Sequence, residues 1–440
     1  MGRIARIALP GIALLISLVA LIAALNIGGG ANPPLLGDPG QGVRFGLPIA
    51  KPLVDITAAT LIGALVLALW AFDSAEAAYR KAIDLAAGSA FALTISAVAV
   101  GILTFVSVSN TPFSADPKFG QQLWFFVTSI ALGQAWMWTI GLAAIVTVLC
   151  IAVTNQTALF FVGLVAMGSL VPMALQGHAA GISGHAAAIT SLGLHLVFVS
   201  VWFGGVVSLV LLRKHIAAVR LTAIVSRYST LAIIAFIVVA VSGVANAAIR
   251  LGGWDALFTS GYGQLVLLKV VGMLALGFFG FAQRGYLLRR MATDAARSAF
   301  WWFISIELVV MGAVAGIAAG LARTPTPVSQ ELNPNPTPAE ILTGDKLPPE
   351  LTLERYFTAW NLDLIWLLIC GFGIFFYLVG VWRLHRRGDL ERMISVSVTD
   401  QFHARILRQP FSHQRFALSR RERAGADLAV LGPHLRQVRA

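Results

Sequence analysis

Long apolar runs separated by short polar connections dominate this chain of 440 residues. The runs are about twenty residues long, which is the length that an α-helix needs to cross a hydrocarbon core of roughly 30 Å. Lipid offers no hydrogen-bond partner to backbone polar groups, so each run is expected to be helical. The predicted spans are 9–28, 52–72, 86–109, 123–150, 158–177, 187–212, 227–249, 262–283, 299–321 and 361–383.

Composition supports the same interpretation. Hydrophobic residues make up 58% of the chain and charged residues only 12%, and the mean hydropathy is +0.80. A soluble domain carries roughly 25% charged residues. We therefore predict an all-α polytopic membrane protein, a helical bundle of about 10 transmembrane helices, located in the plasma (inner) membrane and surrounded by the lipid bilayer.

The net charge of +12 raises the question of a nucleic-acid partner. Its distribution argues against one, because the basic residues lie between the apolar runs and in the tail. Lys and Arg are concentrated in the connections at 80–81, 213–220, 284–297 and 383–387. Connections rich in Lys and Arg face the cytoplasm. The N- and C-termini are therefore predicted to be cytoplasmic, and no nucleic acid is expected to bind.

The N-terminus resembles a signal peptide, since Met1-Gly-Arg-Ile-Ala-Arg precedes an apolar run. That run reaches Ile27, which is longer than the 7–15 residues of a typical signal-peptide core. We expect the first helix to be retained.

The main internal boundary is a proline-rich outer connection, which reads as an extended linker. The tail beyond the last span is basic and has no membrane-length run. The predicted organisation is 1–157, about four transmembrane helices; 158–325, a second transmembrane domain; 326–358, the linker; 359–388, one further helix; and 389–440, a disordered cytoplasmic tail.

Ionisable side chains inside a span are costly, so they mark candidate functional sites. His195 lies about a third of the way into the span 187–212 from its outer face, and Trp202 follows seven residues later on the same helix face. His195 is either a metal ligand or a hydrogen-bonded residue between helices, and position alone does not separate the two.

His178 and His185 precede this span on the outer side, with Met167 and Met173 nearby. Imidazole and thioether groups suit copper, and thioethers favour Cu(I). The metal-ligand hypothesis therefore comprises His178, His185 and His195. The alternative is a flexible outer loop whose histidines bind nothing, and the two methionines are more simply explained by packing.

Lys269 and Glu307 lie in two successive spans and form a second candidate. They are interpreted either as a buried ion pair or, for Glu307, as a relay for protons or cations. Lys269 is expected nearer the outer face and Glu307 nearer the inner face, which makes a direct bridge doubtful.

Small residues repeat at four-residue spacing in two spans, which lets helix backbones approach closely. These helix-packing positions are Gly204, Gly312, Gly316 and Gly320. Motifs for ATP binding, G-x-S-x-G and H-E-x-x-H are absent, so nothing indicates an enzyme.

The region from about 178 to 325 resembles the copper-resistance protein D (CopD) membrane domain. The matching stretches are Gly177-His178, His185-Ala-Ala-Ala, His195 with Trp202-Phe-Gly-Gly, Arg227-Tyr-Ser, Tyr262-Gly-Gln-Leu-Val-Leu-Leu-Lys269, and Glu307 with Leu321-Ala-Arg-Thr-Pro. This resemblance implies copper uptake or homeostasis across the inner membrane. It also implies a copper-binding role for the three histidines and an outer-side copper chaperone as partner.

The stretch Trp360-Asn-Leu-Asp363, with Tyr377-Leu-Val-Gly380-Val and Arg386-Arg-Gly-Asp389, resembles the first helix of a cytochrome c oxidase assembly (CtaG-type) domain. The similarity stops near Asp389, so the domain is expected to be truncated. Terminal oxidase subunits are the partners that this resemblance implies.

Three hypotheses follow. The first is copper transport or homeostasis, with outer histidines collecting copper. The second is assembly or metallation of a terminal oxidase. The third is a haem-binding electron carrier, which needs two axial ligands at matching depth. Only His195 lies clearly within a predicted span, so a bis-histidine haem site is hard to build.

Overall fold

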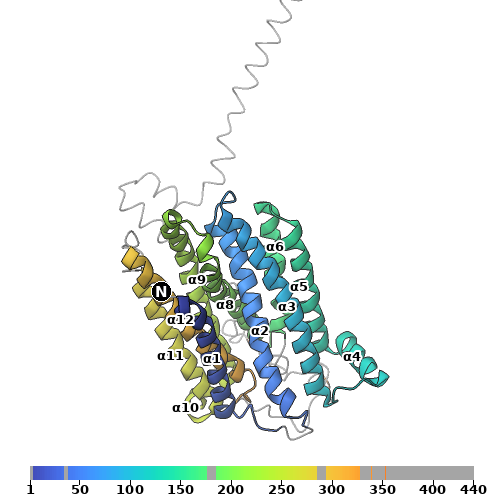
Figure 1. Cartoon of the computed structure of the whole chain (residues 1–440). Coiled ribbons are helices and arrows are strands. Elements are labelled where there is room, and N and C mark those ends of the chain that lie inside the picture. The colour runs from blue at the N-terminus through green and yellow to red at the C-terminus, as the bar shows by residue number, and fades with distance from the viewer. Residues whose placement is uncertain are drawn as a thin grey trace, which may run out of the picture. The chain divides into compact units, whose positions relative to one another are not determined.

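The computed structural model describes residues 3–33, 38–175, 185–284 and 294–327, together with residues 338 and 352. The elements are α1 (Arg3–Ile27), α2 (Gln41–Val66), η1 (Leu67–Ala71), α3 (Ala77–Ser109), α4 (Pro117–Ser129), α5 (Ala131–Ala152), α6 (Gln156–Gly168), α7 (Val171–Ala174), α8 (His185–Leu212), η3 (Arg213–His215), α9 (Ala218–Leu251), α10 (Ala256–Thr259), α11 (Gly261–Ala282) and α12 (Asp294–Leu321). No strand occurs among these residues, and Figure 1 shows long helices running side by side.

The predicted all-α membrane bundle is confirmed within this part of the chain. Eight helical segments are long and apolar enough to span a membrane, and α1 contributes the shorter apolar stretch Gly11–Ile27. Each predicted span between 9 and 321 overlaps the described helices, and two of the spans, 123–150 and 158–177, each overlap two α-helices. The predicted span 361–383, the tail 389–440 and the linker from 328 onward, apart from residues 338 and 352, lie outside the described residues.

The span predicted over 123–150 was wrong in extent, because the helix expected there is broken. Here α4 ends at Ser129 and α5 begins at Ala131, with Ile130 in an extended conformation. The Gln134 side chain donates to the Thr128 carbonyl at 2.6 Å, which stabilises the break. Gly133 lies so close to Phe126 that a Cβ would be 2.1 Å from its carbonyl oxygen. Figure 1 shows α4 projecting away from the bundle.

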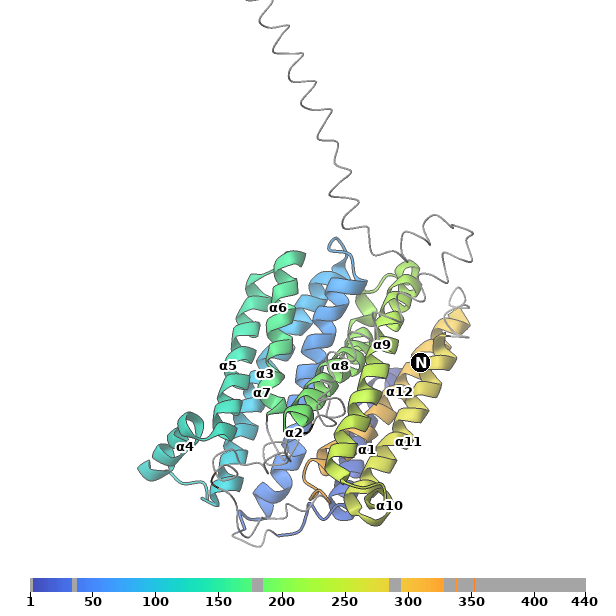
Figure 2. The ribbon, with the colours of Figure 1, turned by 180° about the vertical axis from the view of Figure 1, so that it is seen from behind.

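Successive long helices run in alternating directions, so the connections gather at two ends (Figure 2). One end holds the connections 72–76, 153–155 and 213–217, where Arg220 pairs with Glu76 at 2.5 Å. The other holds 28–33, 38–40, 110–116 and 252–260. We call these the cytoplasmic end and the outer end, after the orientation that the basic residues predict.

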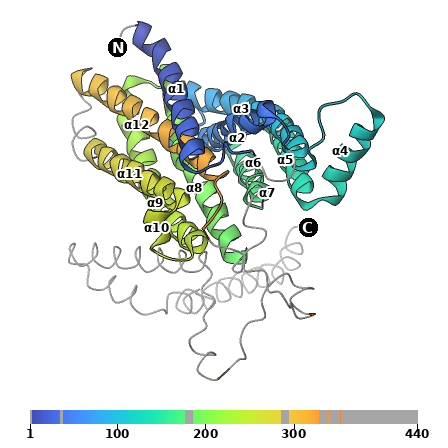
Figure 3. The ribbon, with the colours of Figure 1, turned by 90° about the horizontal axis from the view of Figure 1, so that it is seen from below.

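Two helices at the centre, α2 and α8, pack against each other and link the two halves of the bundle (Figure 3). On one side α3, α5 and α6 complete the packing, and on the other side α9, α11, α12 and α1 do so. The candidate site lies in the second half.

The contact between α2 and α8 is very close because glycines line it. A Cβ on Gly204 would lie 1.7 Å from the Ala59 carbonyl oxygen, and one on Gly63 would lie 2.0 Å from the Gly204 carbonyl carbon. The Ser208 hydroxyl donates to the Thr60 carbonyl at 3.2 Å across the same contact. Small residues allow this approach, which maximises van der Waals contact where lipid provides no hydrophobic drive.

A second close contact joins α1 to α12. It uses Gly312, Gly316 and Gly320, the glycine stripe that the sequence marks for helix packing. A Cβ on Gly316 would lie 2.1 Å from the Ser17 carbonyl oxygen, and one on Gly320 would lie 2.4 Å from the Ala24 Cβ. The first and last described helices are therefore direct neighbours.

Candidate functional site

His195 lies on α8, in the half of that helix nearer the outer end, and its ring faces α9. Its Nδ1 is 3.1 Å from the Val239 carbonyl oxygen and 3.2 Å from the Ser242 Oγ. Gly243 lies beside the ring, and a Cβ there would be in van der Waals contact, 3.4 Å from His195 Cε1. Both hydrogen-bond partners come from one turn of α9, which fixes the orientation of the imidazole.

These partners also determine the tautomer. A carbonyl oxygen only accepts, so Nδ1 carries the proton and donates to Val239. Ser242 is free to accept as well, because its hydroxyl already donates to the Val238 carbonyl at 2.6 Å. Nε2 then keeps its lone pair, and no described residue makes a hydrogen bond to it. An Nδ1–H bond to a backbone carbonyl is the arrangement that orients metal-binding imidazoles.

One positive charge lies near this imidazole, and a second lies near the first. Lys269 on α11 lies within electrostatic range of His195, and Arg250 on α9 lies within range of Lys269. The Arg250 guanidinium donates to the Asn246 side-chain oxygen at 2.6 Å. Within the described residues, no carboxylate forms an ion pair with Lys269 or Arg250. A cation held at His195 therefore experiences repulsion as well as ligation.

Glu307 on α12 belongs to a different polar group, nearer the cytoplasmic end. It is 5% exposed and accepts a hydrogen bond from Gln283 Nε2 at 2.8 Å. The suggested ion pair with Lys269 is not formed between these two described side chains. Fourteen residues separate Lys269 from Gln283, and at 1.5 Å per residue this is roughly 21 Å along the helix axis. The relay role of Glu307 stays a prediction.

A cavity of about 230 Å³ lies beside Glu307, between α8, α9, α11 and α12. Its walls are largely aromatic and aliphatic. Polar groups gather around Glu307 and toward the cytoplasmic end. The lining residues that matter below are Trp202, Tyr228, Phe236, Gln283, Arg284 and Glu307.

The sequence Trp202-Phe-Gly-Gly serves three contacts at once. Gly204 faces α2, as described above. Gly205 faces α9, where a Cβ would lie 2.3 Å from the Tyr228 ring. The Tyr228 hydroxyl donates to the Trp202 carbonyl. The two glycines thus let α8 pack closely on both neighbours, and this positions the Trp202 ring against α9.

The other metal-ligand candidates lie outside this description. His178 and the His185 side chain are outside the described residues, although α8 begins at His185. Met173 is buried in α7, which packs beside Gly193 on the turn of α8 that carries His195. Among the described residues, no three His, Cys, Asp or Glu side chains converge on a point that fits a metal ion. The grouping of the three histidines stays a prediction.

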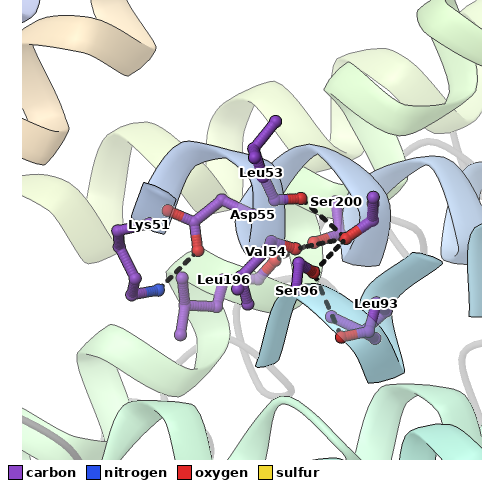
Figure 4. Close-up of polar contacts among 9 residues, drawn as sticks. Lys51, Leu53, Val54, Asp55, Leu93, Ser96, Leu196 and Ser200 are labelled. Atoms are coloured by element: carbon purple, nitrogen blue, oxygen red, sulfur yellow. Dashed lines mark hydrogen bonds and ion pairs between the residues drawn. The ribbon is translucent and has the colours of Figure 1, made fainter. Parts of the chain in front are cut away.

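Sequence reasoning missed a polar cluster on the α2 side of α8 (Figure 4). Lys51 pairs with Asp55 at 2.6 Å, and Thr57 on α2 lies 3.5 Å from Ser96 on α3. The available signal was Lys51 and Asp55 at i and i+4 at the start of an apolar run. The pair satisfies both charges locally, in the outer half of α2.

The described helices and the polar groups buried between them define a multi-pass α-helical membrane protein. Residues 43–189 match the family model "Copper resistance protein D-like, N-terminal domain", and residues 222–321 match "Copper resistance protein D". The second match contains Ser242, Lys269 and Glu307, and His195 lies between the two matches. Residues 360–389, which resemble a cytochrome c oxidase assembly domain, lie outside both matches.

Two curated proteins are similar in sequence. The "Inner membrane protein YebZ" of Escherichia coli (strain K12) is 29% identical over 218 residues, which is 48% of this chain and 73% of that protein. The "Copper transport protein CutJ" of Bacillus subtilis (strain 168) is 31% identical over 163 residues, covering 36% of this chain but only 29% of CutJ. No solved structure matches the chain.

Proposed function

We propose that this protein moves or buffers copper ions at the plasma (inner) membrane, with His195 as a ligand inside the bundle. The observation that carries the proposal is the state of the His195 ring. Val239 holds Nδ1 as the protonated nitrogen, so Nε2 presents a lone pair in the outer half of the membrane. Imidazole nitrogen is a suitable copper ligand. The matches to copper-resistance family models point to the same metal.

In this proposal, outer-side histidines collect the ion and His195 receives it. His178 and His185 supply the outer ligands because they precede α8 on the outer side. A partner that delivers copper on that side, such as a chaperone, fits the same order of events. Nothing in the described residues favours the oxidase-assembly or haem hypotheses over this one.

The direct test is the copper content of detergent-purified protein. Wild type is expected to bind about one or two copper ions when loaded under reducing conditions. A variant with His178, His185 and His195 all replaced by alanine is expected to bind none. His215→Ala, in the cytoplasmic η3 turn, is the matched control and is expected to bind as wild type does. A well-folded wild type without copper, loaded under both reducing and oxidising conditions, would refute the proposal.

Replacing Lys269 is expected to strengthen copper binding, whereas replacing the three histidines is expected to abolish it. Lys269→Met is expected to tighten copper binding by about tenfold, because it removes a repulsion on the order of 1–2 kcal/mol from a cation at His195. Affinity is measured by competition with a chromophoric Cu(I) chelator. Lys51→Met is the control, since Lys51 is already paired with Asp55. Weaker binding in Lys269→Met would show that Lys269 supports the site rather than opposing the ion.

A further inference from the structure

An aromatic side chain fills the space between three helices in the functional half of the bundle. The rings of Trp202 on α8 and Phe236 on α9 meet edge to face, with centroids 5.2 Å apart and an angle of 83° between them. On its other side Phe236 presses on α11, where a Cβ at Gly277 would lie 2.9 Å from Phe236 Cζ. Phe236 is therefore wedged between Trp202 and the bare backbone of Gly277.

Polar groups lie on both sides of this wedge. Toward the outer end, Val239 lies three residues from Phe236 on α9, or roughly 5 Å along the helix. His195 lies seven residues from Trp202 on α8, or roughly 10 Å along that helix. Toward the cytoplasmic end, Tyr228 is eight residues from Phe236, or roughly 12 Å. The contact between Phe236 and Trp202 thus separates the His195 group from the Glu307 group.

The cavity beside Glu307 ends at the same aromatic pair. Both rings line it, and so do Gln283 and Arg284 at the cytoplasmic end of α11. The cavity accordingly extends from the wedge toward the cytoplasmic end. His195 is not among its lining residues.

We propose that Phe236, held between Trp202 and Gly277, is the barrier between an outer compartment at His195 and an inner compartment at Glu307. A copper ion that leaves His195 crosses when the Phe236 ring moves aside, and it exits through the inner compartment. The identity of the ion rests on the function proposed above, whereas the barrier does not. The Glu307 carboxylate balances the positive charge of the ion. As an oxygen ligand it binds soft Cu(I) weakly, which favours release.

Thiol accessibility tests the barrier without any assumption about copper. Cys150 and Cys370 are first replaced by alanine, and Ser242→Cys then reports on the outer compartment. In inside-out vesicles, a membrane-impermeant thiol reagent is expected to label this cysteine slowly. Adding Phe236→Ala is expected to raise the labelling rate by about tenfold or more. Ser229→Cys, which lines the inner cavity, is expected to react at a similar rate with either residue at 236.

Phe278→Ala is the matched control, because that ring is 68% exposed on the outside of α11 and should leave the labelling of Ser242→Cys unchanged. If Phe236→Ala does not accumulate, Phe236→Leu keeps more of the volume and should give an intermediate rate. Fast labelling with Phe236 intact, or an unchanged rate in both variants, would overturn the barrier. In proteoliposomes the same variants should leak Cu(I). Faster labelling without a copper leak would keep the barrier and reject copper as the cargo.

Discussion

Gly204→Leu is expected to abolish recovery of folded, monodisperse protein from membranes. A single Cβ at this position already lies 1.7 Å from the Ala59 carbonyl oxygen. That atom belongs to the backbone of α2, so no rotamer change relieves the clash. The two helices must separate, and their separation removes the contact that joins the two halves of the bundle. Size-exclusion chromatography of a fluorescent fusion in mild detergent measures the effect.

Gly204→Ala is the smaller substitution at the same position. It is expected to destabilise the folded protein by roughly 1–3 kcal/mol or more, the usual cost of overpacking. Gly141→Leu is the control, because Gly141 is in the spanning helix α5 and nothing lies within 4 Å of its Cβ position. A Gly204→Leu protein that elutes like wild type, with an unchanged thermal midpoint, would mean that α2 and α8 do not approach this closely.

His195→Ala is expected to reduce protein-dependent copper accumulation in cells to the level of an empty vector. The side chain supplies the proposed ligand within the bundle, and alanine leaves no donor atom in its place. Ser242→Ala removes one acceptor from Nδ1 while Val239 remains, so a partial loss is expected. Substitution of residues that orient a metal ligand typically costs 10–100-fold in affinity. Whole-cell metal content, corrected for the amount of protein in the membrane, is the measurement.

The two variants together test the role of His195. If His195→Ala accumulated copper like wild type at equal expression, the imidazole would be a structural hydrogen-bond donor between α8 and α9. A graded loss, from none in wild type through Ser242→Ala to His195→Ala, is expected only if ring orientation matters for ligation.

The long helices could be predicted because twenty apolar residues in a row have few other structures open to them in lipid. The break at Ile130 could not. Residues 123–150 contain no charged residue and only scattered polar ones such as Ser129 and Gln134, so hydropathy gives little sign of the turn. What stabilises it is a side-chain hydrogen bond from Gln134 and the absence of a side chain at Gly133. Such local contacts leave little trace in a hydropathy pattern.

The candidate site was predictable only in part. His195 could be found because an imidazole inside an apolar run is unusual. Its main partner is the carbonyl of Val239, and a backbone group has no sequence signal. Lys269 and Glu307 were also recognisable as charges inside apolar runs, yet their depth in successive antiparallel helices separates them. Phe236 looked like any other core aromatic residue, because its position opposite Gly277 depends on how three helices cross.

The pairing of α1 with α12 has a consequence for biosynthesis. Ser17 leaves the ribosome long before its partner Gly316, and at 5–20 residues per second the delay is roughly 15 to 60 s. During that time α1 cannot pack on the glycine stripe of α12. The half of the bundle that holds His195 and Glu307 therefore lacks the pair of helices α1 and α12 at its edge. This half is therefore completed last during synthesis, and removal of α1 by a signal peptidase would leave the stripe of α12 facing lipid.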